Sequence, residues 1–547
     1  MLKRLTHQAL KLACLRADRA FRGQSQQLEQ VQRHKLQQIL QQVANAQGKA
    51  RSLVPTWEDF SQYQAVTRYA QWQEKIHAQR RGESRLTSSP LVRYQPTSGS
   101  SEKLKLIPYT QAFIEQLDAA IAPWLASMYR QYPKMASGTH YWSVSWLPQS
   151  QFADLSGNLN DDSELLGVVK RVLAAQSQAV PADVALAASA DDALFATLCY
   201  LVADRQLRLL SVWSPTFALQ LLDALPVWAD GIIDVLQNGN WRGRQQSLKQ
   251  LTAPYAPSRA QELKRILALP KEAWVAELWP DLALVSAWDT ADAEPWAEQL
   301  QALMPHAAFE GKGLWATEGV VTIPIDGHYP LAYQSHFYEF EDLVNGGILA
   351  SWQLKEGDEV SPIITSGNGL LRYQLDDRIV VSEFWQGVPC FKFLGRRFGV
   401  DMVGEKMSPD AARQALTAVA QQYGVEAVSL LAVQGFEQLK PRYVALFTDK
   451  NMLIPQQLRL DVAQAVEREL RGHFHYELAR DLRQLDSVTA VIAQDGWRVC
   501  QDVAIAGGMI EGNIKPEPVR RAQRHALLSI VPSLQAELSP ELWERAS

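Results

Sequence analysis

The chain has 547 residues, of which 47% are hydrophobic and 21% charged, and its 54 basic and 59 acidic residues leave a formal net charge of -5. This length is too great for one compact core, and the composition is that of a globular protein, which excludes a disordered or fibrous chain. The small net charge gives no sign of a protein that binds nucleic acids or membrane surfaces.

The four cysteines, Cys14, Cys199, Cys390 and Cys500, lie far apart and form no CxxC pair. This spacing fits a reducing cytosol and argues against a disulfide framework or a thiolate metal site. Residues 1–15 lack a long apolar core and a small-residue cleavage signal, so we interpret them as mature sequence. No run approaches the ~18 consecutive apolar residues of a membrane span. We therefore predict a cytoplasmic protein.

Two helical patterns open the chain, at residues 27–46 and 58–79, where apolar residues recur at helical spacing. From Gln111 to Leu303, helical patterns alternate with short apolar runs, which predicts an α/β layer of strands with flanking helices. The predicted helices there cover 111–125, 193–203 and 217–236, and the predicted strands cover 141–146 and 282–288.

A hydroxyl-rich turn lies between a predicted strand at 91–94 and the helix that begins at Gln111. Its sequence is Thr97-Ser98-Gly99-Ser100-Ser101, and Lys105 closes it. Small residues let backbone N–H groups approach a polyphosphate, while hydroxyls and an ammonium contact its oxygens. The turn therefore indicates a phosphate-binding loop. Because its spacing is not that of the Walker loop, an ordinary Ser/Gly loop is the alternative.

Strand patterns dominate from Gly319 to Leu394 and predict a largely antiparallel, distorted-barrel-like layer. Gln386-Gly387 is a plausible hairpin turn between the last two strands. The predicted strands cover 320–325, 348–353, 370–375, 379–381 and 388–394.

The pattern changes after Gly395-Arg396-Arg397, where helices and strands of a small α+β unit begin. We therefore predict two domains, residues 1–396 and 397–547. In the second, the predicted helices cover 409–423 and 456–472, and the predicted strands cover 427–433, 443–448 and 488–493.

Two further stretches contain residue types suited to a nucleotide. In Trp315-Ala316-Thr317-Glu318 the aromatic ring suits a purine, the hydroxyl a phosphate, and the carboxylate Mg²⁺. The alternative is a strand-end turn with a solvated glutamate. In the stretch from Tyr373 to Asp377, a carboxylate at a strand end can accept both ribose hydroxyls, although acidic turn residues are common.

The order of these motifs resembles that of the adenylate-forming superfamily. The motifs are Thr-Ser-Gly-Ser-Ser-x-x-x-Lys, Ala-Thr-Glu, Tyr-x-Leu-x-Asp, and Gly-Arg at the domain junction. More narrowly, the chain looks like the Gretchen Hagen (auxin-responsive promoter) family of acyl acid amido synthetases, from Gln27 to Pro518. The stretches that carry this narrower match are 66–70 with Ile76, 105–110, 278–280, 337–340 and 404–406.

This resemblance implies the fold and the roles of the motif residues. The fold would be an α/β N-terminal adenylate-forming domain, with layered sheets, flanking helices and a distorted β-barrel, followed by a small mobile α+β C-terminal lid domain. The implied nucleotide-binding residues are Ser98, Gly99, Ser100, Ser101 and Lys105 at the phosphates, Trp315 and Ala316 at the adenine, Thr317 at the α-phosphate, Asp377 at the ribose, and also Thr97 and Tyr373.

Four more residues have implied roles in the same family. Glu318 would hold Mg²⁺, and Arg396 would lie at the hinge between the domains. Lys406 and Lys515 would be catalytic cations that the mobile C-terminal domain brings to the site, alongside Lys105 of the N-terminal domain.

The chain departs from the superfamily pattern at two positions. Glu102 stands where the loop usually has glycine, so either its carboxylate points outward or nucleotide affinity is weaker than usual. Asp376 replaces a small or hydroxyl residue before Asp377, so one of the two carboxylates either has a raised pKa or faces solvent.

The predicted activity is ATP-dependent amide formation between a small carboxylic acid and an amino acid, through an acyl-adenylate with release of pyrophosphate. One alternative is transfer of the acyl group to a thiol of coenzyme A or a carrier protein. The other is a nucleotide-binding protein whose catalysis has decayed. Trp213, Phe217 and Tyr338 suggest an aromatic or otherwise flat acid, and core packing explains these three residues equally well.

Overall fold

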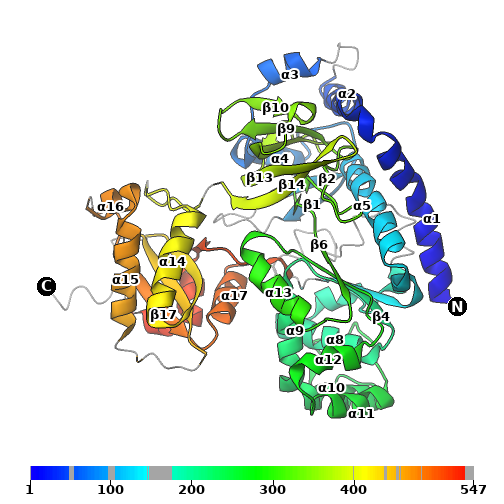
Figure 1. Ribbon diagram of the computed structural model, residues 1–547, viewed down its shortest axis with the longest axis vertical. Coiled ribbons are helices and arrows are strands. Elements are labelled where there is room, and N and C mark those ends of the chain that lie inside the picture. Colours follow the sequence, from blue (N-terminus) through cyan, green and yellow to red (C-terminus); the bar gives the residue numbers. More distant parts are fainter. Residues whose placement is uncertain are drawn as a thin grey trace. The chain divides into compact units, whose positions relative to one another are not determined.

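The computed structural model describes residues 2–48, 55–96, 105–144, 146, 175–397, 399–403, 405–435, 440–450, 455, 458–481, 483–509 and 511–535. Its described residues divide into two compact units between Leu394 and Gly395 (Figure 1). The domain boundary predicted between residues 396 and 397 remains a proposal.

Long helices cover the first part of the larger unit. Helix α1, Leu2–Gly23, packs along α5, Gln111–Gln131, as Figure 1 shows. The ring of His7 anchors this contact, because its two nitrogens lie 2.8 Å from the Tyr129 hydroxyl oxygen and 2.8 Å from the Gly138 carbonyl oxygen. Helix α2, Leu28–Ala46, matches the prediction for 27–46, whereas α1 was not predicted from the sequence.

Two predicted helices are each divided in the structure. The pattern at 58–79 forms α3, Trp57–Tyr63, and α4, Tyr69–Arg80, because the backbone of Thr67 between them pairs with residues 372 and 374. The pattern at 217–236 forms α9, Pro215–Val227, and α10, Ala229–Asn238. Pro226, which has no N–H to donate, lies in the last turn of α9 and favours this break.

The described strands β3, Thr139–Trp142, β4, Leu207–Ser211, β5, Leu284–Ala287, and β6, Ala308–Gly311, form a parallel sheet in that order. Side chains alternate between its faces. Leu209 and Leu284 join the core that includes α5, whereas Leu210 and Val285 join a second core with α8 and α9. The helices around this second core are α8, Ala190–Ala203, α9, α10, α11, Pro257–Ile266, α12, Lys271–Leu278, and α13, Glu294–Ala302.

A mainly antiparallel sheet follows, with the strand order β10-β9-β11-β13-β14 and with β12 paired to β11. Gln386 and Gly387 join β13 to β14 with φ values of 48° and 85°, which suits a tight hairpin and confirms the predicted turn. The bounds are β9, Phe337–Asp342, β10, Ile348–Ala350, β11, Glu359–Thr365, β12, Tyr373–Gln374, β13, Asp377–Trp385, and β14, Val388–Arg396.

The smaller unit contains the described sheet β17-β16-β15-β18 and the helices α14 to α18. Helix α14, Pro409–Tyr423, has the predicted bounds, because the Ser408 side chain caps its first turn and Gly424 ends it at φ 68°. The other bounds are β15, Glu426–Val433, β16, Arg442–Thr448, β17, Thr489–Ala493, β18, Val519–Ala522, α15, Arg459–Arg471, α16, Phe474–Asp481, α17, Gly496–Ala506, and α18, Arg524–Ile530. A large α/β unit followed by a small α+β unit confirms the predicted fold class.

A buried ion pair ties β12 to β9. The guanidinium of Arg372 contacts both carboxylate oxygens of Glu339, at 2.8 Å from Nε and 3.0 Å from Nη2. Glu339 is fully buried, and it also accepts a hydrogen bond from Trp57 Nε1 at 3.1 Å. Arg372 Nη1 donates to the carbonyl oxygen of Ser61 at 2.8 Å, so the pair connects α3, β9 and β12.

Replacing Arg372 by Met should lower the free energy of unfolding of the larger unit by about 3–5 kcal/mol, because it leaves the Glu339 carboxyl group buried without its partner. Thermal and urea unfolding of the full chain measure the loss. Arg81→Met is the matched control, since the ion pair of Arg81 with Glu83 is exposed, and it should leave stability unchanged. Equal losses in the two variants would contradict a structural role for the buried pair.

Candidate active site

The motif Trp315-Ala316-Thr317-Glu318 lies on a small antiparallel hairpin. Strand β7, Trp315–Ala316, pairs with β8, Gly319–Val320, and the predicted strand at 320–325 is reduced to β8 and two isolated bridges. The Tyr109 hydroxyl, on β2, Leu106–Thr110, donates to the Thr317 carbonyl oxygen at 3.0 Å. The hairpin therefore holds Thr317 and Glu318 at its turn, and both are half-buried.

The carboxyl group of Glu318 interacts with several other predicted site residues. The Tyr373 hydroxyl donates to its Oε1 at 3.1 Å. Burial raises the pKa of Glu318, the hydrogen bond from Tyr373 and the charge of Lys105 oppose that shift, and the charge of Asp377 adds to it. Glu318 thus interacts with three other predicted residues, Lys105, Tyr373 and Asp377, and the four come from three separate motifs.

Lys105 is the described residue of the predicted phosphate loop. It is half-buried, and its ammonium lies 5.8 Å from the centre of the Tyr69 ring. The predicted loop residues Thr97, Ser98, Gly99, Ser100 and Ser101, and also Glu102, lie outside the described residues. The flanking strands are β1, Leu91–Pro96, and β2, which pair in antiparallel fashion.

The two adjacent aspartates have different environments. Asp376 is exposed, and its carboxylate lies 3.6 Å from Arg68 Nη2, whereas Asp377 begins β13 and is half-buried. For this pair, either a raised pKa or a carboxylate facing solvent was expected. Asp376 is the carboxylate that faces solvent. The backbone of Thr67, beside Arg68, bonds to residues 372 and 374, which explains why stretch 66–70 accompanies the Tyr373 motif.

Three tryptophans, Trp124, Trp142 and Trp213, surround a buried lysine that was not predicted as a site residue, and a fourth, Trp315, packs against two of them. The ring of Trp315 lies 5.8 Å from that of Trp213 and 6.0 Å from that of Trp124, which is itself 5.9 Å from Trp142. The ammonium of Lys312 lies 4.6 Å from the Trp213 ring centre. One feature could have pointed to Lys312: it follows directly after a parallel strand, and α/β sheets bind ligands at the carboxyl ends of such strands.

Residues 17–309 match the GH3 family N-terminal domain, and residues 329–396 match the GH3 family central domain. The chain belongs to the GH3 family. This membership confirms the family inferred from the motifs.

Individual relatives of this GH3 chain are distant. It is 25% identical over 145 residues to the indole-3-acetic acid-amido synthetase GH3.10 of Arabidopsis thaliana, a match that covers 22% of this chain and only 24% of that protein. The solved structure of AtGH3.15 acyl acid amido synthetase in complex with 2,4-DB has a TM-score of 0.72 and 16% identity, with 96% of each chain covered. GH3.15 acyl acid amido synthetase has a TM-score of 0.71 and 15% identity, with 93% of each covered. The structural likeness shows the shared fold.

The structure does not gather all three residues predicted for an acid pocket in the GH3 chain. Trp213 belongs to the tryptophan cluster. Phe217 packs in the second core, and Tyr338 is fully buried in the first, where its hydroxyl donates to the Val320 carbonyl oxygen at 2.6 Å. Core packing, the explanation left open above, accounts for Phe217 and Tyr338.

The remaining predicted residues belong to the second unit. Arg396 ends β14, and one of its guanidinium nitrogens lies 3.8 Å from a carboxylate oxygen of Glu517. Lys406 is exposed at a φ of 48°, and Lys515 is half-buried, with its carbonyl oxygen accepting from Arg520 at 3.2 Å. Their roles toward a nucleotide remain predictions.

The carboxylates of the first unit fit magnesium bound through a nucleotide. In the described part of the chain, no group of three or more His, Cys, Asp or Glu side chains is placed to hold a metal ion. Mg²⁺ in nucleotide sites usually takes one or two protein carboxylates together with phosphate oxygens, and Glu318 with Asp377 nearby meets that requirement.

Among the helices that the structure describes, none combines the length and the hydropathy of a membrane span.

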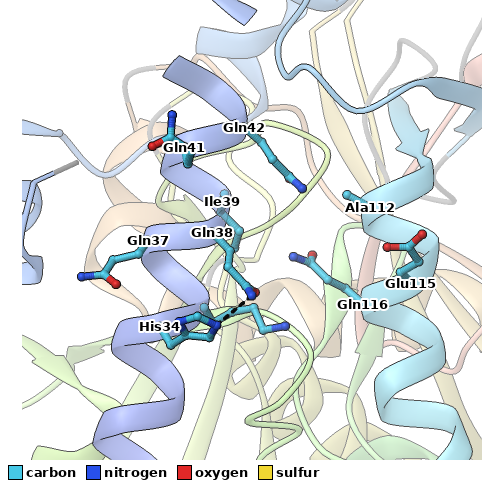
Figure 2. Close-up of a pocket in the computed structure, with 10 residues that line it drawn as sticks. His34, Gln37, Gln38, Ile39, Gln41, Gln42, Ala112, Glu115 and Gln116 are labelled. Atoms are coloured by element: carbon cyan, nitrogen blue, oxygen red, sulfur yellow. Dashed lines mark hydrogen bonds between the residues drawn. The ribbon is translucent and has the colours of Figure 1, made fainter. Parts of the chain in front are cut away.

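A separate polar cavity of about 670 Å³ lies between α2 and α5. Figure 2 shows the side chains of Gln42 and Gln116 extending into it. None of the sequence-predicted site residues is among those that line it. Gln116 connects it to the core, because its Oε1 accepts from the Gly367 amide at 2.8 Å and lies 2.9 Å from His336 Nδ1.

Glu310, at the end of β6, should make the stability of the GH3 chain depend on pH. Burial raises its pKa from 4.5 to about 7, although it accepts a 2.9 Å hydrogen bond from Trp124 Nε1 and lies near Lys312. Below pH 4.5 the carboxyl group is neutral in both the folded and the unfolded chain. Between pH 4.5 and pH 7 the unfolded chain ionises this group while the folded chain keeps it neutral, so the free energy of unfolding falls as pH rises and levels off above pH 7.

We therefore expect the wild type to lose up to about 3 kcal/mol relative to Glu310→Gln between pH 5 and pH 8. The amide keeps the oxygen that accepts from Trp124 and has no charge to bury. Melting temperatures of both proteins across this range measure the difference. Parallel curves for the two proteins would show that Glu310 does not titrate in the folded state near neutral pH.

Proposed function

We propose that this protein is an ATP-dependent acyl acid amido synthetase, which adenylates a carboxylic acid and transfers the acyl group to the amine of an amino acid. The observation that carries the proposal is the convergence of Lys105, Glu318, Tyr373 and Asp377, from three separate motifs, in a chain of the GH3 family. The related proteins named above are themselves called amido synthetases.

The first step solves the problem that a carboxylate is a poor acylating agent, because its leaving group would be oxide. One carboxylate oxygen attacks the α-phosphorus of ATP, the bond to the β-phosphate oxygen breaks, and pyrophosphate leaves. Lys105 offsets the charge that develops on the phosphates, and the hydroxyl of Thr317 donates to the α-phosphate. Magnesium held by Glu318 would supply further positive charge to the phosphate oxygens.

In the second step the amine attacks the acyl carbon, AMP leaves, and the amine loses a proton. The acyl-adenylate is a mixed anhydride that hydrolyses, so the site has to exclude water. We propose that the unit that follows the Gly395–Arg397 segment closes and opens over the site, with Arg396 at the hinge and with Lys406 and Lys515 as its cations. This part of the proposal comes from the family resemblance.

The acceptor is an amine in this proposal, because GH3 membership does not favour the thiol acceptor or the decayed enzyme. A cytoplasmic location is proposed from the four cysteines, which form no disulfide bond and are all buried. The partners are then ATP, Mg²⁺, a small carboxylic acid and an amino acid.

Acid-dependent exchange of labelled pyrophosphate into ATP tests the adenylation step. We expect exchange in the wild type and a loss of about 100-fold in Lys105→Ala, because the variant lacks a cation at the developing charge. Lys355→Ala, at an exposed lysine of the same unit, should keep full activity. Product masses should then show an amide with amino acids and no thioester with coenzyme A. Binding of ATP with no exchange for any acid would contradict the proposal.

Tyr373→Phe tests whether Tyr373 positions Glu318. The variant removes the 3.1 Å hydrogen bond to the Glu318 carboxylate and keeps the ring, so the carboxylate is less well oriented. We expect the Mg²⁺ concentration for half-maximal exchange to rise about tenfold. Tyr63→Phe, at a residue that is 79% exposed, is the control. An unchanged Mg²⁺ requirement would exclude this positioning role.

A further inference from the structure

One face of the parallel sheet concentrates polar and aromatic side chains at its carboxyl edge. The strand register places Trp142, Ser211, Ser286 and Glu310 in one row across β3, β4, β5 and β6. Residues in one row of a parallel sheet point to the same face. This is the face of Leu209 and Leu284, which pack in the core with α5.

Lys312 follows that row directly and is 3% exposed. Its ammonium donates to Ser211 Oγ at 2.8 Å. It also lies 4.6 Å from the ring centre of Trp213, 5.3 Å from that of Trp124 and 5.8 Å from that of Trp142. Indole faces attract cations, so these three rings suit a cationic side chain at this position.

Ser286 supplies an independent sign of a ligand. Its side chain is fully buried, and its Oγ has no hydrogen-bond partner among the described residues. It stands in register between Ser211, which bonds to Lys312, and Glu310. Because burial raises the pKa of Glu310 to about 7, this neighbour repels a bound anion less than an ordinary carboxylate would.

Two carboxyl groups next to the cluster, in sequence or in space, are each influenced by a lysine. The charge of Lys105 opposes the raised pKa of Glu318, three residues after Trp315, and the charge of Lys312 opposes that of Glu310, which accepts from Trp124. Trp315 lies beside Trp213 and Trp124, and it directly precedes the segment that leads to Thr317 and Glu318. A flat molecule along these indoles would have one end toward the hairpin turn and the other toward Lys312.

We propose that this tryptophan cluster holds the acyl substrate and that Lys312 recognises a second carboxylate at the end remote from the reacting one, so that aromatic dicarboxylic acids are the preferred substrates. The proposal rests on the amido synthetase function proposed above. The indole faces take the ring, the ammonium pairs with the distal carboxylate, and Ser286 Oγ donates to it.

The test compares terephthalate with 4-methylbenzoate, which differ in one para group, in the pyrophosphate exchange assay. We expect the wild type to favour the diacid in kcat/KM, and Lys312→Met to lose about 30-fold on the diacid with no loss on the monoacid. Lys355→Met, at an exposed lysine, is the matched control and should keep the preference. A wild-type preference for the monoacid, or an equal loss on both acids in a folded Lys312→Met protein, would overturn the proposal.

Ser286→Ala provides a second, milder variant if Lys312→Met does not fold. It should weaken the diacid selectively, and an unchanged ratio of the two acids in this variant would overturn the proposal. Quenching of tryptophan fluorescence by the diacid without ATP gives a binding readout that does not depend on turnover. Diacid binding that Lys312→Met abolishes, in a protein that exchanges no acid, would uphold this inference while rejecting the proposed function. Exchange with the monoacid but no binding of the diacid would reject this inference and leave the proposed function standing.

Discussion

The buried pair of Arg372 and Glu339 is the interaction on which the arrangement of the site depends. The pair fixes Arg372, the residue directly before the stretch that carries Tyr373 and Asp377. Burying two charges costs several kcal/mol per ion, so such a pair persists where its geometry is good and its other atoms are hydrogen-bonded. Here the guanidinium also reaches the backbone of Ser61, and Trp57 bonds the carboxylate. The pair thereby aligns three segments that are distant in the sequence.

A hydroxyl then transmits this position to Glu318. Tyr373 follows Arg372 directly in the chain. Its hydroxyl donates a hydrogen bond to the carboxylate of Glu318, which lies in the turn after β7. The other side of the hairpin turn is held by Tyr109 through the Thr317 carbonyl oxygen. Thr317 and Glu318 are thus fixed from two sheets of the same unit, which is the rigidity that a phosphate-transfer site requires.

Two carboxyl groups have raised pKa values and are each influenced by one lysine: Glu310, which accepts a hydrogen bond from Trp124, and Glu318, which follows Trp315 by three residues. Burial is the largest cause of both shifts, and the lysine opposes it in both. A low dielectric strengthens every charge interaction that a substrate makes there. The aromatic surface of the tryptophan cluster is apolar, so the cluster combines shape selection with charge selection.

The sequence by itself determined the features that depend on neighbouring residues. The turn at Gln386-Gly387, the capped helix over 409–423, the alternation that indicates an α/β unit and the order of the nucleotide motifs all follow from local geometry or from residue type at fixed spacing. Only the tertiary structure decided the break between α3 and α4 and the environment of Lys312. The break comes from a contact between Thr67 and Arg372, 305 positions apart, and Lys312 meets Ser211 across 101 positions. Such contacts leave no periodic trace in the sequence, because the partner that sets each side chain's burial and charge comes from a different strand.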